Sequence, residues 1–237
     1  MLENSSIYTR ECPILWEVDV LVIGGGSAGT TAAIAAARQG ADVALVDRAA
    51  YLGGTGTSVL DTFYGFYCPG EGQRKVVGGI PDDVVAHLHE RDAAIQRANT
   101  YGAGTGITYD PELLKVVWEE LASQVGVRIL LHTYFLDVVM KDGIVRGAVV
   151  ANKAGLRQIR AKVLVDASGD GDLAFRAGGR YEDWRAVPVQ SLTTTFRVGN
   201  VDVSRARQVT KKQLWSLMAE AVRTHEYRLP RLEGSVH

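Results

Sequence analysis

The sequence predicts an α/β fold in which a parallel sheet is extended by a three-stranded antiparallel meander. A mainly apolar run at 18–23 leads through a glycine turn and a helix of small residues to a second mainly apolar run at 43–47, which is the pattern of a βαβ unit. An Asp-Gly pair at 142–143 separates two alternating runs and is typical of a tight hairpin. A last, mainly apolar run at 163–167 is expected to return the chain to the parallel sheet.

The first strand, helix and second strand follow from local sequence. Residues 18–23 are apolar except for Asp19 and are followed by a glycine, as expected for a parallel strand that is buried on both faces. The spacing predicts a helix over 27–39, whose many alanines let it lie close to the sheet. Gly40 is a normal position for its end. The second parallel strand is expected at 43–47.

Residues 51–109 form a segment in which glycines and aromatic residues alternate without sustained helical or strand periodicity. The exception is a helix near 81–99, because Pro81 followed by two aspartates favours a helix start. A long irregular stretch inside a compact domain is typical of a segment that covers a site.

Regular elements return after residue 110. Asp110 suits an N-cap, Pro111 suits the first helical position and Gly126 suits the end of a helix over 111–125. The sequence then predicts, in order, a strand at 127–132, meander strands at 135–141, 144–152 and 156–161, the strand at 163–167, a strand at 190–198 in a second layer, and a helix at 211–224. We expect a domain boundary near 180, which divides the chain into 1–180 and 181–237.

Composition excludes several classes of protein. The 237 residues are 46% hydrophobic and 22% charged, with a net charge of -1, which describes a globular protein without the basic surface of a nucleic-acid binder. Cys12 and Cys68 show no pairing or zinc pattern, so we expect a reducing, cytoplasmic setting. No apolar run approaches the roughly 18–20 residues of a membrane span, and the N-terminus lacks the pattern of a leader peptide.

Glycine is the outlier, because sixteen of the 26 glycines lie between Gly24 and Gly106. The motif Gly24-x-Gly26-x-x-Gly29 directly follows an apolar strand and opens a helix. In that context the first glycine makes a tight turn, the second lets a pyrophosphate approach the backbone, and the third lets helix and strand pack closely. Asp47 ends the next strand, where a carboxylate accepts hydrogen bonds from ribose hydroxyls and disfavours an NADP phosphate. A bare turn and a solvated charge are the alternatives.

The residues after the second strand indicate the kind of dinucleotide. A nicotinamide-binding domain would normally continue through another helix to a third strand, whereas here the glycine and aromatic segment intervenes and a meander replaces a crossover helix. This pattern favours FAD over NAD.

The chain resembles the FAD-dependent oxidoreductases of the glutathione-reductase-like superfamily, in particular a group related to the flavoproteins of succinate dehydrogenase and fumarate reductase. The resemblance implies a Rossmann-like FAD-binding domain plus the start of a substrate or cap domain, and it covers about residues 17–200. It is carried by four stretches: VLVIGGGSAGTTAAIAAARQGADVALVDR at 20–48, LGGTGT at 52–57, YDPELLKVVWEELASQVGVRILLHT at 109–133 and VLVDASGDGDLAFRAG at 163–178.

The resemblance also implies roles for individual residues. Asp47 would hold the adenosine ribose, with Arg48 beside it, and the backbone at Phe135 would contact adenine. An exposed basic residue is the alternative for Arg48 and a core aromatic for Phe135. The residues implied to cradle the pyrophosphate are Gly24, Gly26, Ser27, Ala28 and Gly29, and those implied to pass it toward the flavin, with a flexible loop as the alternative, are Gly53, Gly54 and Thr55.

A second dinucleotide motif is implied at Ala167, Ser168, Gly169 and Asp170, where the family usually has Ala-Thr-Gly. Ser168 stands in place of the usual threonine and also carries a hydroxyl. Asp170 and Asp172 do not form the spaced acids and late glutamate of a calcium loop, and no metal site is expected.

Catalytic residues remain unknown from the sequence. The five histidines are scattered and none has metal-ligand spacing. Tyr64, Tyr67 and Cys68 lie in the segment that the resemblance places over the flavin, where a proton donor or redox thiol would be useful. Packing is the favoured interpretation for all three.

The sequence therefore predicts an FAD-dependent oxidoreductase that transfers a hydride between a small organic substrate and flavin N5. The alternatives are a non-catalytic FAD- or nucleotide-binding subunit of a split flavoprotein, and an NAD-dependent dehydrogenase. Family members generally continue past this length, so we expect a second polypeptide or a missing C-terminal half to complete the FAD and substrate sites. A natural short form is the alternative. An oligomer is left open, and neither nucleic acid nor a membrane span is expected.

Overall fold

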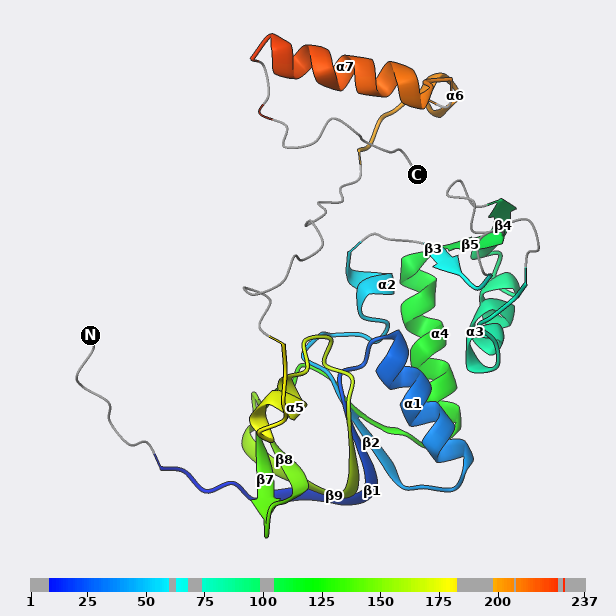
Figure 1. Cartoon of the computed structure of the whole chain (residues 1–237). Helices are drawn as coiled ribbons and strands as arrows, with labels where there is room; N and C mark the ends of the chain where they lie inside the picture. Colours follow the sequence, from blue (N-terminus) through cyan, green and yellow to red (C-terminus); the bar gives the residue numbers. More distant parts are fainter. Residues whose placement is uncertain are drawn as a thin grey trace. The chain divides into compact units, whose positions relative to one another are not determined.

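The computed structural model describes residues 9–59, 63–67, 74–98, 105–182, 198–206, 208–225 and 228 (Figure 1). The chain divides into two compact units, Met1–Thr195 and Phe196–His237. Each unit is described by itself.

The first unit is built on a six-stranded mixed sheet with the order β6-β2-β1-β9-β8-β7. The first four strands of that order are mutually parallel, while β9, β8 and β7 are antiparallel neighbours. The α/β fold class predicted from the sequence, a parallel sheet extended by an antiparallel meander, is confirmed. The strands are β1 (Ile14–Ile23), β2 (Val43–Val46), β6 (Arg128–Leu130), β7 (Tyr134–Lys141), β8 (Ile144–Asn152) and β9 (Gly155–Asp166).

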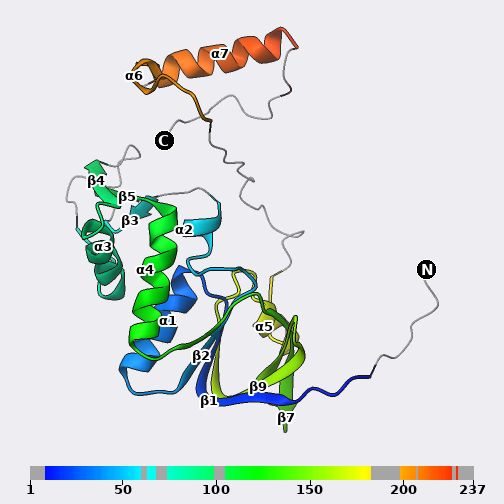
Figure 2. The ribbon, with the colours of Figure 1, turned by 180° about the vertical axis from the view of Figure 1, so that it is seen from behind.

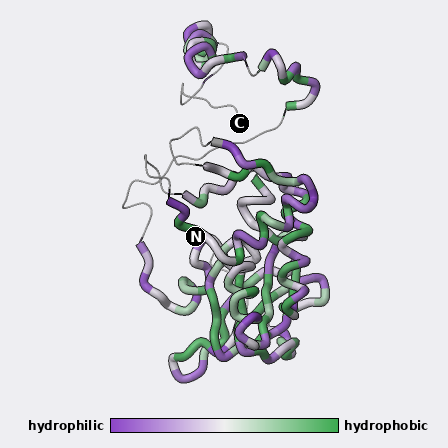
Figure 3. The backbone as a smooth tube through the Cα atoms, turned by 90° about the vertical axis from the view of Figure 1, so that its right-hand side faces the viewer, coloured by the Kyte–Doolittle hydropathy of each residue, from purple (hydrophilic) through white to green (hydrophobic). Residues whose placement is uncertain are grey.

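Two helices, α1 (Ser27–Arg38) and α4 (Pro111–Gln124), lie side by side on one face of this sheet (Figures 1 and 2). Apolar side chains of the sheet and helices form two cores, one on each face. Leu21 and Val22 are consecutive and both are fully buried, yet they belong to different cores. Burial on both faces explains the continuous apolar runs of the central strands, which are visible in Figure 3.

The elements that carry the glycine turn are close to their predicted bounds. The helix begins at Ser27 as expected and ends at Arg38, and Gly40 follows with a φ of 85°. The helix α4 begins at Pro111, because the Asp110 carboxylate accepts hydrogen bonds from the backbone N–H groups of Glu112 and Leu113.

The third meander strand and the returning parallel strand are one element, contrary to the prediction of separate strands at 156–161 and 163–167. Strand β9 runs without interruption from Gly155 to Asp166. It is antiparallel to β8 over its first half and parallel to β1 along most of its length. Exposed Lys162 interrupts the apolar pattern without interrupting the strand, since its ammonium pairs with Asp19 at 2.6 Å.

The prediction of an irregular segment over 51–109 is wrong in part, because this segment contains a second, antiparallel sheet of order β3-β5-β4. The predicted helix near 81–99 is correspondingly too long. The structure ends the helix at His89, where Asp92 adopts a left-handed φ of 53° and Ala93 N donates to Leu88 O at 2.9 Å. The elements are α2 (Thr55–Ser58), β3 (Phe63–Gly65), α3 (Ile80–His89), β4 (Ala94–Ala98) and β5 (Thr105–Tyr109). A short helix, α5 (Asp172–Arg176), follows β9.

The second unit contains helices α6 (Val203–Ala206) and α7 (Lys211–Arg223), the latter close to the predicted 211–224. A capping box starts α7, since Thr210 Oγ1 accepts from Gln213 N and Gln213 Oε1 accepts from Thr210 N. The predicted strand at 190–198 lies, apart from Val198, outside the described residues.

Candidate functional site

The candidate site lies where the carboxyl ends of β1, β2 and β9 meet. The chain leaves β1 toward β2 on one side, and β9 pairs with β1 on the other side. The point where strand order reverses in this way is where open parallel sheets bind their ligands. Gly24 follows β1, Asp47 follows β2 and Ala167 follows β9, so the topology brings three predicted site residues to one edge.

Gly24 and Gly29 are glycines because of contacts within the chain. Gly24 has a φ of 101°, and a Cβ there would lie 2.1 Å from the carbonyl oxygen of Ala167. A Cβ on Gly29 would lie 1.8 Å from the carbonyl oxygen of Gly24. These contacts explain the tight turn and the close packing of helix on strand that the motif predicts.

Gly26 differs from both, because its Cβ position is open. The nearest heavy atom to a Cβ there would be Gly54 Cα, at 3.8 Å. Gly26 is the N-cap of α1, no side chain caps this helix, and its first internal bond runs from Thr30 N to Gly26 O at 2.9 Å. The N–H groups of Ser27, Ala28 and Gly29 come before that bond and so have no acceptor within the helix. They lie at the positive end of the helix dipole. An open approach to such a helix end fits a phosphate group.

The Asp47 carboxylate is held against the glycine turn. Its Oδ2 accepts from Gly25 N at 2.5 Å and its Oδ1 accepts from Ala49 N at 2.6 Å. A carboxylate offers about four acceptor positions, so these two bonds leave capacity for hydroxyl donors. Arg48 is exposed beside it.

The predicted Gly-Gly segment packs directly on the glycine turn. Gly53 N donates to Gly25 O at 2.8 Å, and a Cβ on Gly54 would lie 2.8 Å from Gly26 Cα. Thr55 is the first residue of α2. The two glycine segments are therefore fixed to one another by backbone contact.

The second predicted motif is organised by Asp166, a residue not predicted from the sequence. Its Oδ1 accepts from Ser168 N at 3.1 Å and from Ser168 Oγ at 2.7 Å, and its Oδ2 accepts from Ala174 N at 2.8 Å. Burial, the largest single influence, raises the pKa of Asp166, but the hydrogen bonds from Ala174, Ser168 and Leu173 together outweigh it and lower the pKa overall. An acid at a strand end with serine two residues later is the signal that could have found this turn.

The Ser168 hydroxyl both donates and accepts hydrogen bonds within the chain, since its Oγ also accepts from Asp172 N at 2.9 Å. Gly169 and Asp170 are exposed in the same turn. Phe135 lies on β7, half-buried against the second core. It lies two residues after Thr133, whose N–H donates to Asp47 O at 2.9 Å, so the start of the meander is joined to the end of β2.

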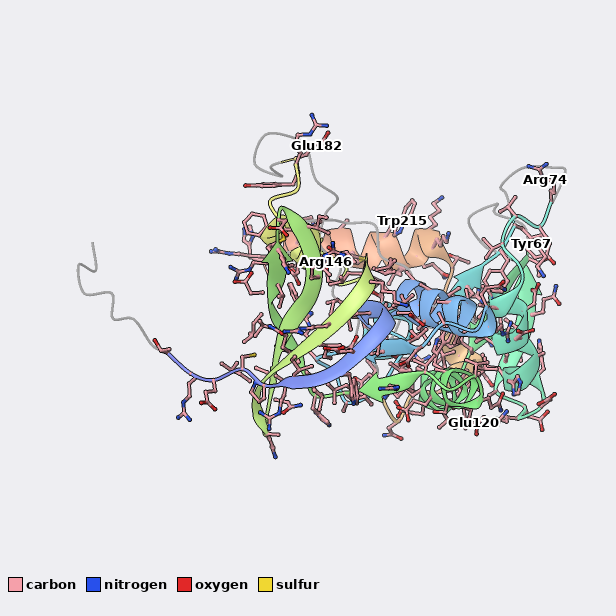
Figure 4. All side chains as sticks on the ribbon, turned by 90° about the horizontal axis from the view of Figure 1, so that it is seen from below. Tyr67, Arg74, Glu120, Arg146, Glu182 and Trp215 are labelled. Carbon is pink, nitrogen blue, oxygen red and sulfur yellow. The ribbon has the colours of Figure 1, made fainter. Side chains whose placement is uncertain are left out.

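Tyr64 makes a contact that sequence reasoning missed. Its hydroxyl lies 3.3 Å from Ser27 Oγ, at the first residue of α1. The backbone of Tyr67 forms an isolated antiparallel β-bridge with that of Lys75. Figure 4 places Tyr67 at the small-sheet end of the first unit, away from Arg146 on β8. Cys68 lies outside the described residues.

Within the part of the chain that the structure describes, no three His, Cys, Asp or Glu side chains gather as possible metal ligands. No helix in that part is long and apolar enough to cross a membrane.

The family model described as FAD dependent oxidoreductase matches residues 19–236. The chain belongs to this family. FAD is therefore the cofactor of the family to which the chain belongs, which confirms the resemblance, the oxidoreductase class and the cofactor predicted from the sequence.

Curated relatives share part of their length with this member of the FAD-dependent oxidoreductases. Digeranylgeranylglycerophospholipid reductase of Methanosphaerula palustris is 26% identical over 211 residues, which cover 81% of this chain and 48% of the relative. Thiamine thiazole synthase of Methanococcus vannielii is 27% identical over 203 residues, which cover 77% of this chain and 72% of the relative. The chain spans about half the length of the reductase relative.

Among solved structures, THI4 of Thermovibrio ammonificans aligns with 20% identity and a TM-score of 0.47, covering 68% of this chain and 61% of that one.

Proposed function

We propose that the first unit binds FAD non-covalently at the carboxyl edge of its main sheet, and that the chain takes part in hydride transfer between a small organic substrate and flavin N5. The observation that carries the proposal is the uncapped start of α1 behind Gly26, set against Gly54, with the Asp47 carboxylate on the same turn. When bound, FAD supplies the electron-transferring centre, and the protein supplies position and electrostatics.

The pyrophosphate would be held by backbone donors. Gly24 and Gly29 shape the turn, while the open Cβ side of Gly26 lets a phosphate approach the N–H groups of Ser27 and Ala28. Each of the three motif glycines then has a reason. Gly24 and Gly29 are required by packing within the chain, and Gly26 is required because a phosphate must reach the backbone there.

The ribose and adenine would lie beside the end of β2. Asp47 keeps acceptor capacity beyond its bonds to Gly25 and Ala49, so it would accept from the ribose hydroxyls. Arg48 would flank the ribose, and the backbone near Phe135 would contact adenine.

The other predicted residues would guide the cofactor away from the ribose. Gly53, Gly54 and Thr55 would pass the pyrophosphate toward the flavin, which is supported by their contact with the glycine turn. Ala167, Ser168, Gly169 and Asp170 would border the other side. Because the Ser168 hydroxyl already bonds Asp166 and Asp172 N, we propose that this turn contributes its backbone and its shape.

A second candidate function, a FAD-binding part that needs further polypeptide for catalysis, is favoured by one observation. The match covers 48% of the reductase relative, so about half of that protein has no counterpart in the alignment. The relatives' names imply different substrates, and the proposal therefore stays at the level of a small organic molecule.

The test is to purify the chain, release any bound cofactor by denaturation, and identify it by chromatography and absorption. We expect FAD, with a bound spectrum that dithionite bleaches. A colourless chain that takes up NAD but not FAD would contradict the proposal.

Catalysis is tested separately by anaerobic bleaching of the bound flavin with candidate substrates, using this chain alone and together with any polypeptide that co-purifies. Bleaching by the chain alone favours the enzyme, whereas bleaching only with a second polypeptide favours the binding part.

A further inference from the structure

Tyr64 reaches the candidate site from a different part of the fold. It lies on β3, in the small sheet, while Ser27 is the first residue of α1. Its hydroxyl and Ser27 Oγ are 3.3 Å apart, and either atom can be the donor. In Figures 1 and 2, β3 and α2 lie at the same end of α4. The pair thus joins the small sheet to the start of the dinucleotide helix.

The ring of Tyr64 is held in place by its neighbours. Its centroid lies 4.5 Å from that of Tyr109 and 5.7 Å from that of Phe66, with which it stacks. Tyr109 and Phe66 are only 4% and 8% exposed. Packing fixes the ring, so the hydroxyl is presented to Ser27 from a rigid base.

Gly56 provides the room for this arrangement. A Cβ on Gly56 would lie 3.0 Å from Tyr109 Oη and 3.1 Å from Tyr64 Oη, so both hydroxyls converge on its Cα. The Tyr109 hydroxyl has its own acceptor, Gly56 O, at 3.1 Å. The contact that the structure gives the Tyr64 hydroxyl is the one with Ser27.

The number of hydrogens on these hydroxyls decides which of the two donates the hydrogen bond between them. Phosphate oxygens accept hydrogen bonds, and a serine hydroxyl has one hydrogen. If Ser27 donates that hydrogen to a phosphate, its contact with Tyr64 is satisfied only when Tyr64 is the donor. The chain of donation then runs from Tyr64 to Ser27 to the phosphate, with charge-assisted character at its last step.

We infer that Tyr64 is a positioning residue for the pyrophosphate of the cofactor, acting through the Ser27 hydroxyl. The inference rests on the proposed FAD function and deepens it, since it makes the small sheet part of cofactor binding. Tyr64 orients the group that touches the phosphate and does not touch the phosphate itself.

The experiment removes the cofactor, titrates the apoprotein with FAD and measures Kd by the quenching of flavin fluorescence. The proteins compared are the wild type, Tyr64→Phe, Ser27→Ala and the double variant. We expect each single variant to raise Kd by roughly 3- to 10-fold, the range of one net hydrogen bond. The double variant should raise Kd by no more than about twofold beyond the weaker-binding single variant, because both changes break the same chain of bonds.

Tyr109→Phe is the matched control, since it removes a hydroxyl from the same aromatic cluster that bonds Gly56 instead of Ser27. We expect its Kd to stay within about twofold of the wild type, an effect smaller than that of one hydrogen bond. The ³¹P resonances of bound FAD give a second measurement that packing alone would not move. They should shift in Tyr64→Phe and Ser27→Ala but not in Tyr109→Phe.

Several outcomes decide the matter. Unchanged Kd and ³¹P shifts in Tyr64→Phe, or fully additive effects in the double variant, overturn this inference and leave the proposed function standing. A wild-type chain that takes up no FAD overturns the proposed function and this inference with it. If Tyr64→Phe does not fold, Gly56→Ala replaces it, because the new methyl would lie 3.1 Å from Tyr64 Oη and 3.0 Å from Tyr109 Oη and would push both hydroxyls outward. Tyr109→Phe then shows how much of its effect comes from Tyr109. An unchanged Kd and unchanged ³¹P shifts in Gly56→Ala also count against the inference.

Discussion

Gly24 and Ala167 touch through their backbones, since a Cβ on Gly24 would lie 2.1 Å from Ala167 O and 2.9 Å from Ser168 Cα. The contact joins the two predicted dinucleotide motifs at the ends of β1 and β9. There is no room for a side chain between the two motifs. Substitutions along this edge should therefore distinguish residues needed for folding from residues needed for binding.

Replacing Gly26 or Gly29 by alanine should give opposite results. The Cβ of Gly29→Ala would lie 1.8 Å from Gly24 O, so we expect a loss of stability of more than about 2 kcal/mol. The Cβ of Gly26→Ala would meet no heavy atom closer than 3.8 Å. This variant should fold with a near wild-type melting temperature and lose FAD affinity. Thermal melts and FAD titrations of both variants make the comparison. A Gly26→Ala protein that binds FAD as well as the wild type would remove this glycine from the cofactor site.

Asp47→Ala should weaken FAD binding. Because the carboxylate would accept from the ribose in a partly buried site, we expect a loss of about 1–3 kcal/mol in binding free energy, measured by titration of the apoprotein. Some loss of stability should accompany it, since Asp47 also bonds Gly25 and Ala49. Asp42→Asn, which alters a carboxylate just before the start of the same strand, is the control and should leave FAD affinity unchanged. Equal affinities for all three proteins would refute the assignment.

Asp166 should make the fold sensitive to acid. Its folded-state pKa is lowered, below the value of about 3.9 in an unfolded chain, so its contribution to stability is present above that value and is lost as pH falls through the folded pKa. Asp166→Asn should therefore be less stable than the wild type at pH 7, and the difference should shrink below about pH 4. Urea midpoints across this range test it, with exposed Asp170→Asn as the control. A difference that stays constant with pH would be the contrary result.

Asp92→Gly should stabilise the chain. Asp92 lies in the turn after α3 and has a φ of 53°, a conformation that costs a non-glycine residue energy but suits glycine. We expect a gain of about 0.5–1 kcal/mol in the free energy of unfolding. Glu90→Gly, two residues earlier where the backbone is helical with a φ of -58°, should instead destabilise by about 1 kcal/mol. Chemical denaturation of both variants checks the sign, and a destabilised Asp92→Gly would contradict the structure of this turn.

The parts of the fold that sequence could predict are those whose signals are local. The glycine turn, α1 and α4 were predicted within about two residues of their bounds because caps, prolines and glycines mark their ends. The strand at 94–98 was missed because its residues, Ala-Ile-Gln-Arg-Ala, are compatible with a helix. They form a strand because they pair with β5, and pairing between segments outweighs local propensity.

The candidate site divides in the same way. The glycine positions are predictable because the motif ties each glycine to a turn or a packing contact. Tyr64 and Asp166 were not, because their roles depend on contacts with Ser27 and with the Ser168–Ala174 turn that only the folded chain creates. The prediction of the bounds of β9 was wrong for a related reason. Lys162 interrupts the apolar pattern of the sequence, but its backbone continues the strand.

The pairing of β1 with β9 has a consequence for the order in which the protein is made. Glu17 and Arg160, which face each other across these strands, are separated by 143 positions along the chain. Until the ribosome has released residues near 166, one edge of β1 has no partner and the turn at Gly24 lacks the wall formed by Ala167. Contacts so distant in sequence form slowly, and an unpaired central strand is prone to aggregation. We expect nascent chains that stop before β9 to bind chaperones and to retain no cofactor, and the proposed dinucleotide site to be among the last features to mature.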